Sequence, residues 1–249
     1  MKFLSFFFTL LFPVLVSAQI INIEDKRLGY KKDGWNGNID FNLRYTQNTN
    51  SVWQFNNQAS LLYRKDTSSH LIISNISLNR SNKSNLINAG FIHYRYGRKI
   101  PAVKQLKFEC FNQYQYNSVQ KIKFRFLAGT GLRVKVIGND SINLNFGWSF
   151  MYEYEEITTP EFNHALRNSN YLSFNAKIGK DWSIKTIFYY QPNVLDFDDF
   201  RMSNNTSISH SLTSKISLVG TMSFLYDSRP PLEVPLNIFQ GHILVRYKF

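Results

Sequence analysis

Residues 241–249, GHILVRYKF, end the chain and decide the expected fold. Every second position of this segment is apolar or aromatic: Ile243, Val245, Tyr247 and Phe249. Successive side chains of a β-strand point to opposite faces, so one face of such a strand would be apolar up to the terminal carboxylate. A globular protein rarely ends in this way. The segment therefore predicts a β architecture whose other strands should repeat the alternation.

The same period of two continues along the chain from Gly34. Its clearest example is residues 122–136, where apolar residues alternate with Lys123, Arg125, Arg133 and Lys135. The pattern predicts an all-β fold, an antiparallel transmembrane β-barrel of about 12 strands, an even number as in bacterial single-chain barrels. The expected strands are residues 35–46, 52–63, 70–79, 86–96, 106–116, 122–136, 142–154, 171–178, 182–191, 200–212, 215–226 and 238–249. A soluble lipocalin-like barrel or a β-sandwich would also alternate, but its inward row would be the apolar one.

The predicted connections differ in length. If both termini are periplasmic, even-numbered connections should be short turns and odd-numbered ones can be long. Residues 138–140 and 179–181 have the composition of tight turns, whereas 157–167, 192–199 and 227–237 are expected to be long loops. The fourth connection, 97–104, is longer than this scheme predicts. The alternation also slips within residues 70–79, which predicts a β-bulge near Ser74.

The first 18 residues have the composition of a secretory signal peptide. One cation, Lys2, precedes a short apolar run that ends in Val16-Ser17-Ala18. A membrane-anchoring helix is the alternative, but the run is short and contains Pro13. The expected division is therefore a signal peptide (1–18), a periplasmic lead-in (19–33) and an outer-membrane barrel (34–249).

Composition agrees with a barrel and excludes other classes. The chain has 22 Phe and 14 Tyr, yet its mean hydropathy is −0.28. A barrel combines these features because its strands face lipid on one side and a polar interior on the other. The formal net charge of +12 comes from residues spread along the strands, which argues against a nucleic-acid partner and favours anionic lipid headgroups or an anionic solute. Cys110 is the single cysteine, so no internal disulfide or thiolate metal cluster is expected.

Two resemblances extend this interpretation. The terminal strand resembles the closing strand of bacterial outer-membrane barrels, in which the alternating apolar residues and the final aromatic serve as the signal for the barrel assembly machinery. Several segments resemble the salt-induced outer-membrane proteins, catalogued as domain of unknown function 481: Glu109 with QYQYN (113–117), RFLAGTGLR (125–133), MYEYE (151–155) and YDSRPP (226–231). The last segment comprises Tyr226, Asp227, Ser228, Arg229, Pro230 and Pro231. This resemblance implies an outer-membrane barrel expressed under envelope stress, in contact with lipid and lipopolysaccharide, and it implies no catalytic residues.

The rows opposite the apolar ones should line the interior. The candidate pore-lining residues are Arg44, Lys107, Glu109, Lys123, Arg125, Arg133, Lys135, Glu153, Glu155 and Arg246. Strands 106–116, 122–136 and 142–154 are adjacent, so their charged residues could pair across the strands. One hypothesis is a basic constriction that selects small anions. The alternative is an interior filled by ion pairs, in a non-conducting barrel with a structural or stress-adaptive role, because 12 strands lie between the filled and the open cases.

An outer-membrane hydrolase is a third hypothesis. Its candidate bases are His164 and His210, neither of which lies in a recognisable catalytic motif. His164 with Glu161 could bind a metal ion, and Asp196, Asp198 and Asp199 could bind calcium. In both cases an ordinary charged loop is the favoured interpretation. We therefore expect no catalytic residue, no metal site and no cofactor.

Overall fold

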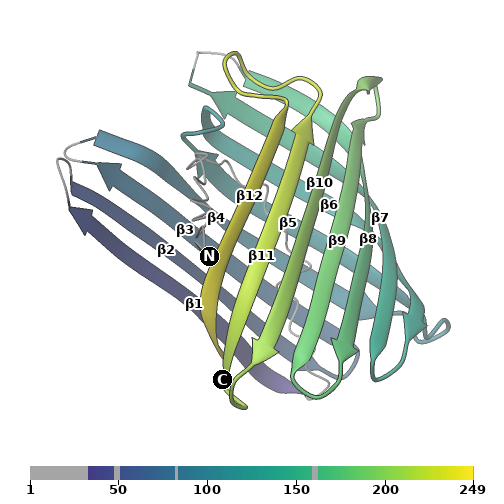
Figure 1. Ribbon diagram of the computed structural model, residues 1–249. Coiled ribbons are helices and arrows are strands. Elements are labelled where there is room, and N and C mark those ends of the chain that lie inside the picture. The colour runs from purple at the N-terminus through teal and green to yellow at the C-terminus, as the bar shows by residue number, and fades with distance from the viewer. Residues whose placement is uncertain (1–32, 48–50, 82–83, 159–161, 249) are drawn as a thin grey trace, which may run out of the picture.

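The computed structural model describes residues 33–47, 51–81, 84–158 and 162–248 (Figure 1). The expected signal peptide and residues 19–32 of the expected lead-in lie outside the described residues, as does Phe249. Among the described residues, no helix has the length and apolar character needed to cross a membrane.

The structure is a closed antiparallel barrel of twelve strands, which confirms the predicted fold class. Each strand pairs with its neighbours in sequence, and β1 closes the barrel against β12. The strands are β1 (Gly34–Gln47), β2 (Ser51–Lys65), β3 (Ser68–Ser81), β4 (Ser84–Lys99), β5 (Leu106–Asn117), β6 (Ile122–Gly138), β7 (Ile142–Ile157), β8 (Phe162–Ile178), β9 (Trp182–Asn193), β10 (Asp196–Ser211), β11 (Ile216–Asp227) and β12 (Asn237–Lys248). The end of the barrel at which β1 starts and β12 finishes is called proximal below, and the opposite end is called distal.

Two of the expected long loops are strands. β8 begins at Phe162 and β10 at Asp196, so the seventh and ninth connections are much shorter than predicted. The polar residues that suggested loops instead continue the ladders with β7 and β9. The eleventh connection, residues 228–236, is long as predicted, and it lies at the distal end.

The predicted bulge near Ser74 is wrong. The pairing of β3 with β2 and β4 is continuous there, and the irregularity in β3 lies between Asn79 and Arg80. The pattern changes because Leu71 and Ile73 face inward, where they form a buried cluster with Leu62 and Phe91. The barrel interior is therefore apolar in one place, and alternation alone could not distinguish this from a bulge.

Many of the aromatic residues lie on the outer surface. Trp35 packs on Tyr63 near the proximal end, with 4.8 Å between ring centroids, and Tyr45 packs on Trp53 near the distal end, at 4.5 Å. Such rings mark the two interfaces of a membrane barrel. The residues proposed as the assembly signal also point outward: the side chains of Ile243, Val245 and Tyr247 are exposed.

The seam between β1 and β12 is short. The register pairs Asn38–Phe41 with Val245–Lys248, and no further pair joins these two strands among the described residues. Toward the distal end, the strands β1–β4 diverge from β12 (Figure 1). Within the paired region, Arg246 donates hydrogen bonds to the Asp40 carboxylate at 2.9–3.2 Å, so a buried ion pair crosses the seam.

Candidate functional site: the barrel interior

A compact group of charged side chains lies inside the distal end of the barrel. We call it the rim cluster. It comprises Arg125, Arg167, Arg201, Glu153, Glu155, Asp199 and Asp227. These residues come from β6, β7, β8, β10 and β11, and the alternation of each strand points its member inward.

Glu153 is at the centre of the rim cluster. Its carboxylate accepts hydrogen bonds from Arg201 at 2.6 Å and from Arg167 at 3.1 Å, and it lies 4.0 Å from Arg125. Arg201 stands on β10, three strands from β7, so this contact depends on the curvature of the wall. The Glu153 side chain is 4% exposed. Burial of this carboxylate is tolerated because arginine guanidinium groups donate hydrogen bonds to both of its oxygens.

The other members complete the cluster. Arg125 pairs with Glu155 on the adjacent strand. The sequence indicated that such cross-strand pairs could form here, without fixing these two partners. Arg167 binds both oxygens of Asp199, at 3.0 and 3.2 Å, and Arg201 donates from Nε to Asp227 at 2.8 Å. Each arginine therefore has at least one carboxylate partner, and the distal interior is close to electrically balanced.

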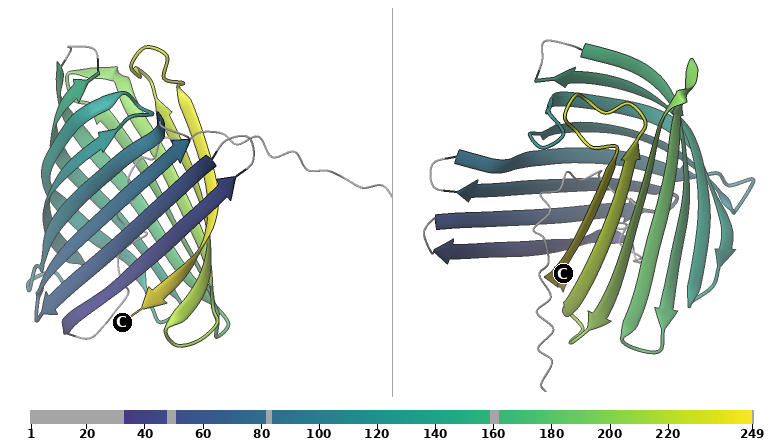
Figure 2. Two further views of the ribbon diagram at one scale, coloured as in Figure 1. Left: turned by 90° about the vertical axis from the view of Figure 1, so that its left-hand side faces the viewer. Right: turned by 45° about the horizontal axis from the view of Figure 1, so that its top comes forward.

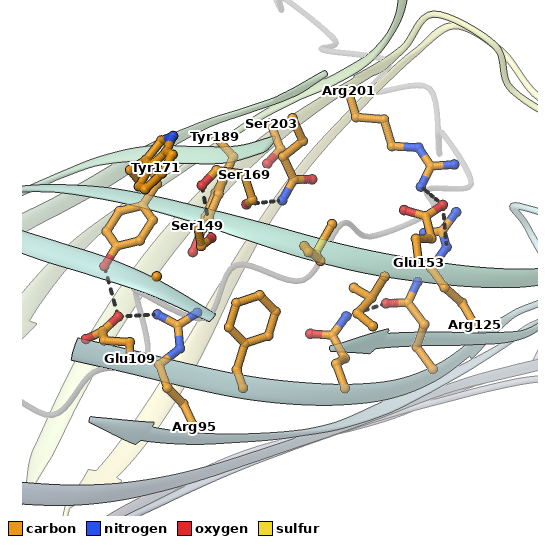
Figure 3. Close-up of a pocket in the computed structure, with 18 of the residues that line it drawn as sticks. Arg95, Glu109, Arg125, Ser149, Glu153, Ser169, Tyr171, Tyr189, Arg201 and Ser203 are labelled. Atoms are coloured by element: carbon orange, nitrogen blue, oxygen red, sulfur yellow. Dashed lines mark hydrogen bonds and ion pairs between the residues drawn. The ribbon is translucent and has the colours of Figure 1, made fainter. Parts of the chain in front are cut away.

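A second polar bridge lies deeper in the barrel (Figure 3). The Glu109 carboxylate accepts hydrogen bonds from Arg95 at 3.2 Å and from the Tyr171 hydroxyl at 3.2 Å. Tyr171 comes from β8, three strands from β5, and its ring lies over Gly147, where a Cβ would overlap the ring. The guanidinium of Arg133 lies 5.9 Å from the centre of the same ring, which is a cation–π distance.

A cavity of about 70 Å³ lies between the rim cluster and this bridge, and residues of both line it. About 10–15 Å³ suffices for one water molecule, so the cavity has room for only a few. Its polar lining includes Ser149, Ser169 and Ser203, and its aromatic lining includes Tyr189 (Figure 3). The distal half of the interior is therefore narrow and largely filled by side chains.

The proximal half of the interior has a different charge. Besides Arg95 and Arg246, the cations on its inward rows include Arg64, Lys99, Lys107, Arg133, Lys135, Lys177 and Lys185. Two acidic residues on the inward rows of this half, Asp40 and Glu109, pair with arginines. In the register, Lys99 stands opposite Lys107, and Lys107 stands opposite Arg133. Three adjacent strands thus place like charges side by side, so this half of the interior is strongly basic.

The structure relocates some of the predicted lining residues. Lys123 was expected inside, but a register shift between Ile122 and Phe124 leaves it exposed, where it pairs with Glu156. The predicted inward position of Lys123 is therefore wrong. Arg44 is on an inward position of β1, but it lies beyond the paired part of the seam and is exposed. Lys135 points inward near the proximal end and is also exposed.

The hydrolase candidates lie on the outer face. The Tyr152 hydroxyl and His164 Nδ1 form a hydrogen bond of 2.7 Å on the exposed outer surface, and the ring of His210 stacks on Trp182 at 4.5 Å. Glu161 lies outside the described residues. Across the parts of the chain that the structure describes, no group of three His, Cys, Asp or Glu side chains could hold a metal ion.

Sequence reasoning did not identify several partners in these networks: Arg95, Arg167, Asp199, Asp227 and Tyr171. Arg167 and Asp199 were hidden because their segments were assigned to loops. Asp227 was identified only through the family resemblance. Arg167, Ser169 and Tyr171 do alternate, and this phase could have extended β8 to its observed start.

Comparisons with known proteins agree with the architecture. The family described as "Protein of unknown function, DUF481" matches residues 33–235. The solved structure of the KdgM porin is 11% identical, covers 86% of this chain and 99% of its own, and superposes with a TM-score of 0.50. The NanC porin is 9% identical, covers 85% of this chain and 98% of its own, and has the same TM-score. At these identities the similarity establishes the porin-like fold. No curated protein matches the chain.

Proposed function

We propose that this chain, which belongs to the DUF481 family of proteins of unknown function, forms a narrow, anion-preferring pore in the bacterial outer membrane. The observation that carries the proposal is the basic proximal interior. Rings of lysine and arginine attract anions and repel cations when they line a narrow path. The aromatic residues at both ends of the outer surface support a membrane location. With both ends of the barrel sequence on the periplasmic side, the proximal end faces the periplasm.

The proposal includes the expected processing and partners. A signal peptide (1–18) would direct export, the lead-in (19–33) would precede the barrel, and Ile243, Val245, Tyr247 and Phe249 would be recognised during assembly. Outer-membrane lipid and lipopolysaccharide would surround the barrel, and the solute would be a small anion. The protein would act without catalysis. A role in envelope stress rests on the family resemblance alone.

A non-conducting barrel is the second candidate, because the rim cluster and the small cavity resemble a filled interior. Purified protein in a planar bilayer under a KCl gradient distinguishes the two. We expect a reversal potential on the anion-selective side. A cation-selective potential would refute the pore, and so would a bilayer that stays silent both for this protein and for variants of the loop 228–236.

The proximal cations can then be tested directly. Neutralising Lys135 and Lys177 to Gln should lower the ratio of chloride to potassium permeability, because both occupy inward rows and are exposed to the interior water. Lys180→Gln is the matched control, since Lys180 lies in the turn between β8 and β9 at the same end. An equal effect of the control would show that these cations act through general surface charge and not as a lining.

A further inference from the structure

The loop between β11 and β12 crosses the distal opening. Residues 228–236 form this loop, which we call the strap. Glu233 in the strap forms an ion pair with Lys121, in the turn between β5 and β6. In the strand order, these two connections are separated by six strands in either direction round the barrel. The pair therefore joins opposite walls, and Figure 2 (right) shows the strap extending from β11 and β12.

An apolar seat lies beneath this ion pair. Leu225 and Ile238, at the two ends of the strap, are 4% and 8% exposed, and Val119 and Val234 pack against them. Val119 belongs to the opposite wall. The space left between the strap and Ile122 is about 10 Å³, which is at the lower limit for a single water molecule. The strap is therefore packed closely against the opposite wall at this contact.

The strap is fixed on its own side. The Ser228 backbone N–H donates to the Phe200 carbonyl at 3.0 Å, and the Phe200 N–H donates to the Ser228 hydroxyl at 2.8 Å. Arg229 donates a hydrogen bond to the Asp196 carboxylate at 2.7 Å and forms an ion pair with it. Three prolines, at positions 230, 231 and 235, stiffen the rest of the strap. It is therefore a rigid segment attached to one wall and touching the other.

The contact with the opposite wall has the properties of a releasable latch. Lys121 and Glu233 both have positive φ angles, 56° and 67°. Residues other than glycine rarely adopt this conformation, and such strained positions concentrate at switch regions. The Glu233 side chain is 82% exposed, so the ion pair is solvated and is weakened by salt. The fixed side of the strap has no such strain at Ser228 or Arg229.

We propose that the strap is the gate of the pore, and that the Lys121–Glu233 ion pair and the apolar seat hold it closed. Release of this pair frees the strap from the β5–β6 turn while its Ser228 and Arg229 contacts keep it attached to β10. The part of the distal opening that the strap spans, above the rim cluster, then becomes accessible to ions. This inference rests on the proposed pore function and adds a closed state to it.

Crosslinking tests the gate. In a Cys110→Ser background, Lys121→Cys and Glu233→Cys are joined by a short, reducible methanethiosulfonate crosslinker in the bilayer chamber. A crosslinker is required because two long side chains separate the backbones beyond the normal span of a disulfide. We expect the crosslink to abolish conductance and a reducing agent to restore it. Unchanged conductance after complete crosslinking would overturn the gate and leave the pore intact.

Release is tested by Glu233→Gln, which should raise the open fraction several-fold. Glu156→Gln is the matched control, because it breaks the exposed Lys123–Glu156 pair between neighbouring strands at the same end and should change nothing. If the parent is silent and Glu233→Gln conducts, the gate is supported. If the parent conducts and the open fraction is unchanged in Glu233→Gln, the gate alone is refuted. If every variant is silent, including one with the strap shortened, the pore and the gate are both refuted.

Discussion

Arg201 should contribute more to the stability of the barrel than Glu153, although the two side chains bond each other. The rim cluster holds three arginines and four carboxylates. Neutralising Glu153 leaves three of each, and every arginine keeps another carboxylate. Neutralising Arg201 leaves two arginines against four carboxylates, and it removes the arginine that binds Asp227. Leaving a buried charge unpaired costs about 3–5 kcal/mol, whereas losing hydrogen bonds to a charged group costs about 1–3 kcal/mol.

Unfolding by urea in detergent micelles, followed by tryptophan fluorescence, measures the difference. We expect Arg201→Gln to lower the free energy of unfolding by about 3–5 kcal/mol and Glu153→Gln by about 1–3 kcal/mol. Arg201→Lys should fall between them, because it keeps the charge but loses the bidentate fork. A loss for Glu153→Gln equal to or greater than that for Arg201→Gln would refute the charge balance assigned to the cluster.

Three further predictions concern the seam, the proximal interior and the strap. Asp40→Asn removes the buried ion pair with Arg246 from the short β1–β12 seam, so it should destabilise the barrel by about 3 kcal/mol and lower the temperature of the band shift on a detergent gel. Lys99→Glu places an opposite charge beside Lys107, so it should stabilise the fold by up to about 1 kcal/mol in the urea assay while weakening anion preference. The charged group that faces Glu233 is Lys121, and its hydrogen bond lowers the pKa of the Glu233 carboxyl. The Lys121–Glu233 ion pair is therefore fully formed above the ordinary pKa of 4.5, and it is lost as the pH falls through the lowered pKa. The open fraction should therefore rise at acidic pH in single-channel recordings, and a rise that persists in Glu233→Gln would refute the assignment.

The strands could be predicted from sequence because a barrel with an apolar outer surface and a polar interior imposes a simple rule on them. In β6 and β7, outward residues are mostly apolar and inward residues face polar groups, so period two is nearly unbroken. The rule fails where the surroundings change. β3 buries Leu71 and Ile73 inside the barrel, and the first part of β8 carries Asn168 and Asn170 on its outward row. Both departures look like loops or bulges in the sequence, although the backbone ladder continues through them.

The interior contacts could be predicted only in part. Arg125 and Glu155 occupy facing positions on adjacent strands, so register is sufficient to pair them. The contacts of Glu153 with Arg201 and of Glu109 with Tyr171 join strands that are three apart. Such contacts depend on how sharply the wall curves and on which long side chain bends across the lumen. Alternation carries no information about either property.

The two halves of the interior differ, and this explains why composition alone could not decide between a pore and a filled barrel. In the distal half, carboxylates neutralise the arginines and side chains occupy most of the space, as a filled barrel requires. In the proximal half, Lys99, Lys107 and Arg133 stand side by side on neighbouring strands, an arrangement that opposes folding. A barrel with a purely structural role gains nothing from this repulsion, whereas a pore gains an attractive potential for anions. This row of cations therefore supports the proposed pore, whereas the ion pairs of the distal half fit either candidate. We infer that the selectivity step of the proposed pore lies in this row, toward the proximal end of the barrel.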